Sequence, residues 1–192
     1  MRENFTDAEK QFVRISPPYI VRKGIYTFEE FLEISDEEGK WELSGGEIII
    51  HSPTSFDHEE ITAKIIAQIV KQAKDKGKVF GSNAVYHLSE ITSYAPDVSF
   101  VSKERLGLVK EKYFEGSPDI VVEVISKSTK KYDVLEKLPK YQEAGVKVIV
   151  YVFCEEKRLQ ILRKGNYYQE ETYTSGKINV MDDISLDLDE LW

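Results

Sequence analysis

Two segments of this sequence place a carboxylate inside a β-branched run that is typical of a buried strand. Asp97 lies in residues 95–101, and Glu123 lies in residues 118–126. A charged group in an apolar strand is costly unless it is paired, hydrogen-bonded or bound to a metal. Because side chains alternate between the faces of a sheet, the two carboxylates converge if their strands are neighbours. Such a pair suits Mg²⁺ or Mn²⁺, hard cations with oxygen ligands, and points to phosphodiester chemistry.

Length and composition indicate one globular domain over residues 1–192, with 41% hydrophobic and 31% charged residues. The sequence shows neither the apolar run of a membrane helix nor a signal peptide, so we expect a cytoplasmic protein without a membrane partner. Cys154 is the single cysteine and is expected to be a core thiol. The net charge of −8 argues against avid nucleic-acid binding by the whole surface. Six lysines within 127–147 form one basic segment, a pattern that is more often a solvated helix face.

The spacing of apolar residues predicts an α/β (α+β) fold with a mixed β-sheet core flanked by helices, and with antiparallel hairpin extensions. We expect an irregular N-terminal arm over 1–24, a core over 25–154 and a C-terminal hairpin extension over 155–192. The first elements expected in the core are a helix from a capping box at Thr27 to Ile34 and a hairpin over 40–50. A long helix follows, capped by Thr54 or Ser55 and ended by Gly77, and after it a strand over 79–88 and a short helix or loop over 103–114. The last elements are a helix from a hydroxyl cap within 126–129 to Ala144 and a strand over 146–153.

Lys137 is the candidate for a cation that assists this chemistry. A phosphodiesterase needs a metal to polarise the phosphoryl group and activate water, and usually a cation near the developing charge. Asp133, Lys137 and Tyr141 share one helix face directly after the strand of Glu123. The alternative, a surface ion pair between Asp133 and Lys137 that contributes little, is equally compatible with the spacing.

These motifs together resemble the Uma-two family of restriction endonucleases, which have a PD-(D/E)XK nuclease-like core. The resemblance covers about Tyr26 to Cys154. It rests on Pro96-Asp97, on the hairpin over 41–53, and on a stretch over 116–129 that continues through Asp133, Lys137, Tyr141 and 144–146. It implies that Asp97 and Glu123 are metal ligands and that a lysine from the following helix, here Lys137, is catalytic. Glu42 and His58 match polar family positions near the site.

The sequence departs from the wider nuclease pattern at two positions. Ile125 stands where the catalytic lysine of that pattern is expected, two residues after Glu123. Pro139 lies two residues after Lys137, where a proline in a helix interior would remove a hydrogen bond. His58 lies on the inward face of its helix, where a core or capping histidine is slightly favoured over a site residue. Asp119 begins its strand about 13 Å from Glu123, and we expect it to be structural.

The leading hypothesis is therefore a divalent-metal-dependent DNA endonuclease, with Asp97 and Glu123 as ligands of Mg²⁺ or Mn²⁺, Lys137 as the catalytic cation and Glu42 as an assisting group. One alternative is a catalytically inactive nuclease-fold scaffold or nucleic-acid-binding module. Another is a metal-dependent phosphohydrolase that acts on small phosphates. We expect a homodimer, because two-fold symmetry suits cleavage of two strands.

Overall fold

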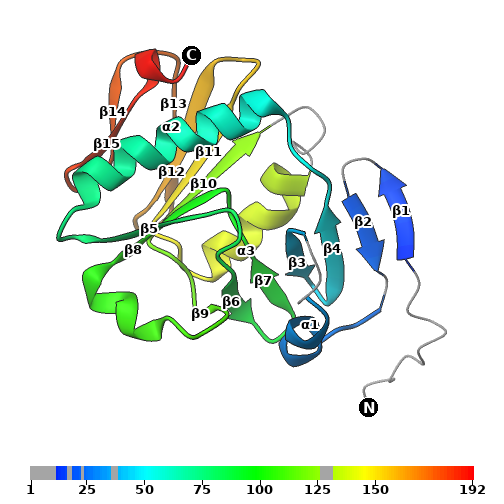
Figure 1. Cartoon of the computed structure of the whole chain (residues 1–192). Coiled ribbons are helices and arrows are strands. Elements are labelled where there is room, and N and C mark those ends of the chain that lie inside the picture. Colours follow the sequence, from blue (N-terminus) through cyan, green and yellow to red (C-terminus); the bar gives the residue numbers. More distant parts are fainter. Residues whose placement is uncertain (1–11, 17–18, 23, 36–38, 126–131) are drawn as a thin grey trace.

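The structure is a computed structural model that describes residues 12–16, 19–22, 24–35, 39–125 and 132–192. Its elements form mixed β-sheets with helices against them, which confirms the predicted fold class (Figure 1). Within these ranges, none of the helices combines the length and the apolar character needed to cross a bilayer.

A six-stranded mixed sheet forms the centre of the fold. Strands β10 and β11 are parallel neighbours joined through a helical segment, and the other adjacent pairs are antiparallel. The predicted order of strand, crossover helix and strand is thus confirmed. The strands, in spatial order, are β13 (Tyr168–Tyr173), β12 (Arg158–Lys164), β11 (Val148–Phe153), β10 (Ile120–Ile125), β8 (Val98–Ser102) and β5 (Gly77–Gly81).

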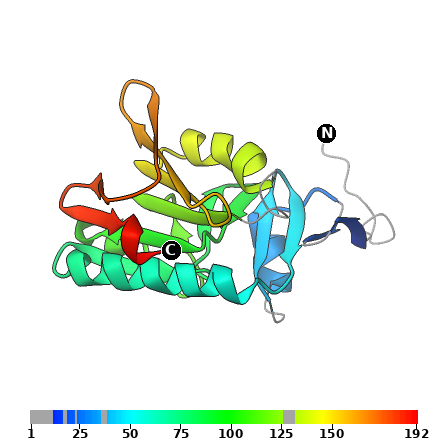
Figure 2. The same cartoon turned by 90° about the horizontal axis from the view of Figure 1, so that it is seen from above.

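Helices α2 (Phe56–Ala73) and α3 (Lys137–Glu143) cover opposite faces of this sheet (Figure 2). The face toward α2 buries Val122 and Val124 of β10 against the apolar stripe of the helix. The opposite face buries Val121 and Ile125 of β10 against Tyr141 of α3. Because side chains of a strand alternate, Glu123 falls on the α3 side.

A seven-stranded sheet packs beside the first one and carries the predicted hairpin. Gly45 and Gly46 have φ values of 59° and 88°, which a two-residue turn between right-twisted strands requires. The small helix α1 (Phe28–Ile34) begins at Thr27 with both hydrogen bonds of the predicted capping box. The strands, in spatial order, are β1 (Phe12–Ser16), β2 (Tyr19–Arg22), β4 (Glu47–His51), β3 (Trp41–Ser44), β7 (Thr92–Tyr94), β6 (Tyr86–Ser89) and β9 (Phe114–Glu115).

Three sequence-based expectations for single elements are wrong. The described part of the arm over 1–24 is not irregular, because β1 pairs with β2 and β2 extends the hairpin by pairing with β4. The strand predicted over 79–88 is two strands, β5 and β6, which belong to different sheets. The long helix ends at Ala73 rather than at Gly77, which begins β5. A Cβ atom at Gly77 would overlap the carbonyl oxygen of Val101, so close strand packing explains this glycine.

The segment after β10 shows how Pro139 is accommodated. A π-helical turn over Tyr132–Glu136 precedes α3, so Pro139 lies in the first turn of the α-helix. The N–H groups of a first turn have no partner inside the helix, and a proline is tolerated there. Lys137 therefore keeps its place in a helix that faces the sheet. The predicted hydroxyl caps over 126–129 lie outside the described residues.

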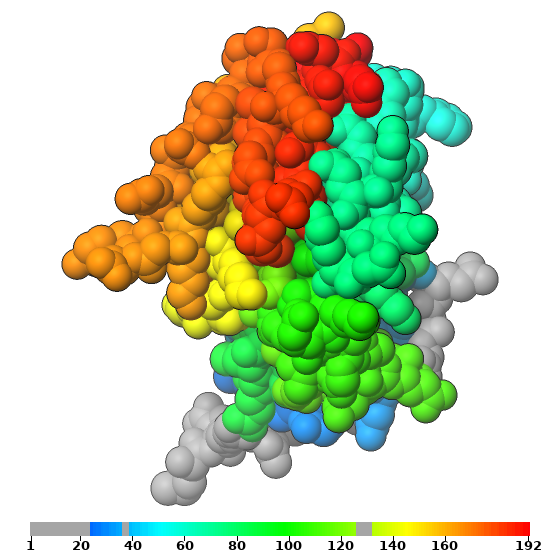
Figure 3. Space-filling model, turned by 90° about the vertical axis from the view of Figure 1, so that its left-hand side faces the viewer, coloured from blue at the N-terminus to red at the C-terminus, as the bar shows by residue number. Residues whose placement is uncertain are grey.

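The C-terminal part extends the central sheet and covers part of α2. The hairpin β12–β13 confirms the predicted extension, and a separate pair, β14 (Lys177–Met181) and β15 (Ile184–Asp187), lies along α2 (Figure 3). The Gln72 amide donates to Ser185 O at 2.7 Å and accepts from Ser185 N at 3.0 Å, and Gln68 bonds Asp187 in the same way. These side chains satisfy the backbone of an edge strand. Short 3₁₀ helices cover Lys103–Leu108 and Leu188–Glu190.

Candidate active site

The two predicted carboxylates meet at one end of the central sheet. Val122 of β10 lies opposite Val98 of β8. The next residues outward, Glu123 and Asp97, are therefore neighbours, and the N–H of Val124 donates to Asp97 Oδ2 at 2.9 Å. Both side chains are buried, with 5% of Asp97 and 1% of Glu123 exposed. The convergence expected from strand alternation is present in the structure.

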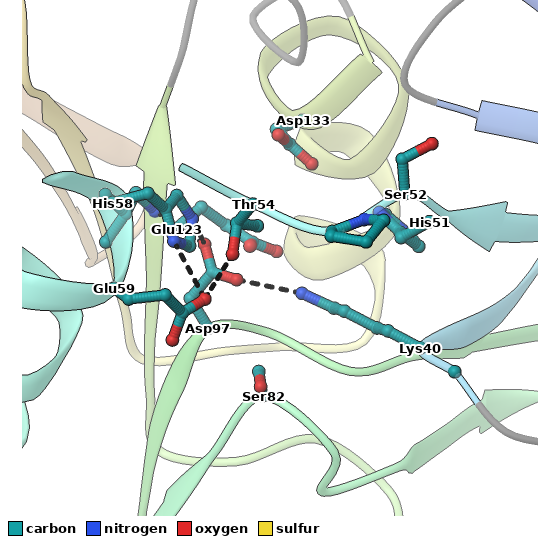
Figure 4. A pocket seen from close by; sticks show the side chains of 13 residues that line it. Lys40, His51, Ser52, Thr54, His58, Glu59, Ser82, Asp97, Glu123 and Asp133 are labelled. Carbon is teal, nitrogen blue, oxygen red and sulfur yellow. Dashed lines mark hydrogen bonds and ion pairs between the residues drawn. The ribbon is translucent and has the colours of Figure 1, made fainter. Parts of the chain in front are cut away.

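A cavity of about 410 Å³ opens beside these carboxylates (Figure 4). Its wall comes from the β3–β4 hairpin, the segment leading into α2, the first turn of α2, and the ends of β8 and β10. The polar groups along this wall suit a charged, hydrated ligand. The described lining residues are Gly39, Lys40, His51, Ser52, Pro53, Thr54, His58, Glu59, Ser82, Asp97, Glu123, Val124 and Asp133.

Asp97 is held in its charged form by two neighbours. Lys40 Nζ donates to Asp97 Oδ1 at 2.9 Å, and His58 Nε2 lies 3.1 Å from Asp97 Oδ2. Burial alone would raise the pKa of Asp97, but Lys40 and His58 outweigh burial and hold this pKa well below its usual range. Burial likewise opposes the protonated form of His58, yet the bond to Asp97 raises the pKa of His58.

His58 reaches this position because it lies in the first turn of α2. The Ser55 hydroxyl caps the helix by accepting from His58 N at 3.2 Å, which selects Ser55 from the two caps that the sequence allowed. The side chain then points toward Asp97 in the cavity wall (Figure 4). The slightly favoured interpretation of His58 as a core or capping histidine therefore misses its contact with the site.

Glu123 is the carboxylate whose proton affinity is raised. Burial, together with repulsion from Asp97 and Asp133, exceeds the attraction of Lys137 and raises the pKa of Glu123 to about 7. Lys137 Nζ donates to Glu123 Oε1 at 3.0 Å, and the Tyr141 hydroxyl donates to the same oxygen at 2.6 Å. A carboxylate with this pKa changes its charge near neutral pH, which is a property of many functional sites.

Lys137 contacts three carboxylates and does not line the cavity. Its Nζ lies 2.9 Å from Glu42 Oε1, 3.0 Å from Glu123 Oε1 and 3.2 Å from Asp133 Oδ1. The side chain is fully buried and is not part of the cavity lining. Burial would lower the pKa of Lys137, but the three carboxylates raise it well above its ordinary value. The surface ion pair that the sequence left open is therefore excluded, because this lysine is not at the surface.

Glu42 links the hairpin to the site without facing the cavity. Its Oε1 accepts from Ala95 N at 2.9 Å, in the segment just before Asp97. Its Oε2 lies 2.8 Å from His51 Nε2. Burial opposes the charged form of Glu42, but Lys137 and His51 keep its pKa well below the usual range. Glu42 is thus the anchor of Lys137 and of the backbone that precedes Asp97.

Sequence reasoning missed Lys40 and His51. The signal for Lys40 was present, because Lys40 and Glu42 alternate with the buried Trp41 along the hairpin and so point to the side away from its core. His51 ends β4, where Glu42 lies across the hairpin within hydrogen-bond distance. Both contacts depend on strand pairing, which spacing within one segment does not show.

Three further expectations concern Asp119, the basic segment over 127–147 and Cys154. Asp119 lies at the far end of β10, 2.8 Å from Lys147 Nζ and 3.2 Å from Arg105 Nη1, and it accepts from Ser102 N at 2.8 Å. This placement agrees with a structural role for Asp119.

Of the basic segment over 127–147, three lysines lie outside the described residues and Lys137 is buried. Cys154 is half-buried after β11, and burial raises the pKa of its thiol to about 11.

Comparison with known proteins identifies the family. A model of the Uma2 family, described as "Putative restriction endonuclease", matches residues 28–189. The chain belongs to the Uma2 family. A solved structure from Anabaena variabilis, described as a "putative nuclease belonging to DUF820", has a TM-score of 0.71 and 18% identity over 86% of this chain and 96% of that chain. This likeness confirms the restriction-endonuclease-like fold of the Uma2 chain. No curated protein matches it.

Proposed function

We propose that this protein is a divalent-metal-dependent endonuclease that hydrolyses DNA phosphodiester bonds. The observation that carries the proposal is the meeting of Asp97 and Glu123 beside one polar cavity. Family membership supports the same reaction, because the Uma2 model is described as a restriction endonuclease model. We assign Asp97 and Glu123 as the ligands of Mg²⁺ or Mn²⁺.

The residues present fit such an ion. Among the described residues there is no group of three or more histidine, cysteine, aspartate or glutamate side chains placed to hold a metal. Mg²⁺ is nevertheless usually bound by one or two carboxylates, with water and substrate phosphate as the remaining ligands. The net charge of the site also fits a divalent cation. Four carboxylates lie together with two lysines, so the group carries a net charge of −2 when the histidines are neutral. These residues, the acid–lysine cluster, are Glu42, Asp97, Glu123, Asp133, Lys40 and Lys137.

These contacts support a role for each residue in the proposed site. A bound divalent ion would polarise the phosphoryl oxygen and lower the pKa of a water molecule. Asp97 is charged at neutral pH and His58 fixes its orientation. Lys137 favours the charged form of Glu123, which burial disfavours, and Glu42 holds Lys137 in place. Lys137 Nζ lies 3.0 Å from Glu123 Oε1, and the role of Lys137 as the catalytic cation remains a prediction.

Cleavage of supercoiled plasmid tests this proposal. Purified wild type, Asp97→Asn and Glu123→Gln are incubated with plasmid in Mg²⁺ or Mn²⁺, with EDTA as the metal-free control. Glu143→Gln is the matched acid variant, because Glu143 is exposed and pairs with Lys140 away from the cavity. We expect metal-dependent nicking by wild type and Glu143→Gln, and at least about 100-fold slower nicking by both site variants, because a metal contributes several kcal/mol to the barrier.

The other functions give different results. Inert wild type that binds DNA with the same affinity in EDTA indicates the nucleic-acid-binding module. Hydrolysis of model phosphoesters without any preference for polymers indicates a small-molecule phosphohydrolase. A homodimer remains a prediction, and sedimentation of the purified protein tests it: a dimer has twice the chain mass of 22.2 kDa.

A further inference from the structure

The two lysines of the acid–lysine cluster have different surroundings. Lys137 is fully buried, and its Nζ contacts three carboxylates within 3.2 Å. The rings of Tyr94 and Tyr132 also lie 5.6 and 5.4 Å from this ammonium group. The N–H groups of the Lys137 ammonium therefore point at protein groups. A phosphate that approached Lys137 would have to displace buried carboxylates and leave them without a counter-charge.

Lys40 is placed in the opposite way. Its side chain is 17% exposed and lines the cavity, and its carboxylate partner among the described residues is Asp97, at 2.9 Å. In Figure 4 it extends along the cavity with its ammonium group toward Asp97. A lysine on a flexible stem moves its charge by rotating side-chain bonds. When Lys40 turns toward a ligand in the cavity, the buried Asp97 keeps its contact with His58 Nε2 at 3.1 Å.

Lys40 also stands where two cavities adjoin. A second cavity, of about 280 Å³, shares Gly39 and Lys40 with the first and has apolar walls that include Phe31 and Trp41. A polymeric substrate that places a phosphate at Asp97 and Glu123 passes close to this shared wall. The position suits a cation that binds the phosphate backbone.

We propose that Lys40 is the residue that contacts the phosphate group of the substrate, and that Lys137 is a positioning residue that acts through Glu123 and Glu42. The inference rests on the proposed function and refines it, because it separates binding of the phosphate from the arrangement of the carboxylates. It assigns a substrate contact to a residue outside the motifs of the family resemblance.

The salt dependence of DNA binding distinguishes the two roles. Each lysine–phosphate contact with duplex DNA contributes about 0.9 to the slope of log affinity against log salt concentration. We expect Lys40→Gln to weaken binding and to reduce this slope by about 0.9, and Lys40→Arg to restore it. Lys137→Met, measured below its unfolding temperature, is expected to keep the wild-type slope. Lys177→Gln is the control, because Lys177 is exposed in β14.

Binding is measured by fluorescence anisotropy with a labelled duplex in Ca²⁺, and cleavage is measured in parallel in Mg²⁺. An unchanged slope in Lys40→Gln, with a wild type that binds and cleaves DNA, overturns the assignment of Lys40 and leaves the proposed function intact. The same loss of slope in Lys137→Met as in Lys40→Gln also overturns it. A wild type that neither binds nor cleaves DNA contradicts the proposed function and this inference together.

Discussion

Replacing Lys137 by methionine is predicted to destabilise the fold strongly. Lys137 is fully buried and compensates Glu42, Glu123 and Asp133, which lie 2.9, 3.0 and 3.2 Å from its ammonium group. Methionine fills a similar space but supplies no charge. Removing one partner of a buried ion pair costs about 3–5 kcal/mol, because the other charge stays buried without compensation. For a chain of 192 residues this corresponds to a decrease of roughly 6–20 °C in Tm.

Urea denaturation at pH 8 in EDTA, followed by circular dichroism, measures this loss. Lys140→Met is the matched control, because Lys140 is on the same helix, is 41% exposed and pairs with Glu143. We expect that control to change the free energy of unfolding by about 0.5 kcal/mol or less. The double variant Lys137→Met/Glu123→Gln is expected to regain about 1–2 kcal/mol, because one uncompensated carboxylate is gone.

The reasoning is refuted if Lys137→Met unfolds within about 1 kcal/mol of wild type. That result would mean that the three carboxylates do not depend on Lys137 for their charge. Equal losses in Lys137→Met and Lys140→Met would show a general effect of the helix rather than of the ion cluster.

Three further predictions concern other groups. The folded state raises the pKa of Glu123 from 4.5 to about 7, so it binds this proton more tightly than the unfolded chain. The metal-free protein should lose up to about 3 kcal/mol as pH rises from 4.5 through 7, and Glu123→Gln should reduce this slope in urea titrations, leaving a part due to His58, whose pKa the fold also raises. An increase in stability over that range would contradict the assignment. Gln72→Ala should cost about 1–3 kcal/mol and speed hydrogen exchange at Ser185, because both hydrogen bonds of Gln72 to Ser185 are lost. Unchanged exchange would argue against this contact. Asp119→Ala should lower Tm while leaving plasmid cleavage per folded molecule unchanged; a cleavage defect would give Asp119 more than a structural role.

The sequence predicted those parts of the fold that depend on local patterns. Local patterns predicted the capping box at Thr27, the apolar stripe of α2 and the alternating side chains of β10. Each of these patterns depends on residues that lie close together in the sequence. The convergence of Asp97 and Glu123 followed from alternation plus one assumption, that their strands are neighbours. The pairing of β8 with β10 provides that condition.

The remaining features depend on pairing between distant segments. The break within residues 79–88 is an exception, because Gly81, Ser82 and Asn83 form a local turn signal that the expectation of one strand overlooked. The N-terminal strands form because β4 offers an edge to β2, which no local pattern shows. The contact of Lys40 with Asp97 depends on the pairing of β3 with β7, which lies just before Asp97 in the chain. Glu42 was assigned to the site, but its role as the anchor of Lys137 required the position of α3.

Titration of the metal-free protein with Mn²⁺ by calorimetry tests most directly that Asp97 and Glu123 form a metal site. We predict saturable binding to wild type and to the control Glu143→Gln, and affinity at least about 100-fold weaker in Asp97→Asn and Glu123→Gln, because each variant removes one of two charged oxygen ligands. The variants must show the circular dichroism spectrum of the folded wild type. Wild-type affinity in both folded site variants would contradict the account, because the ion would then bind elsewhere.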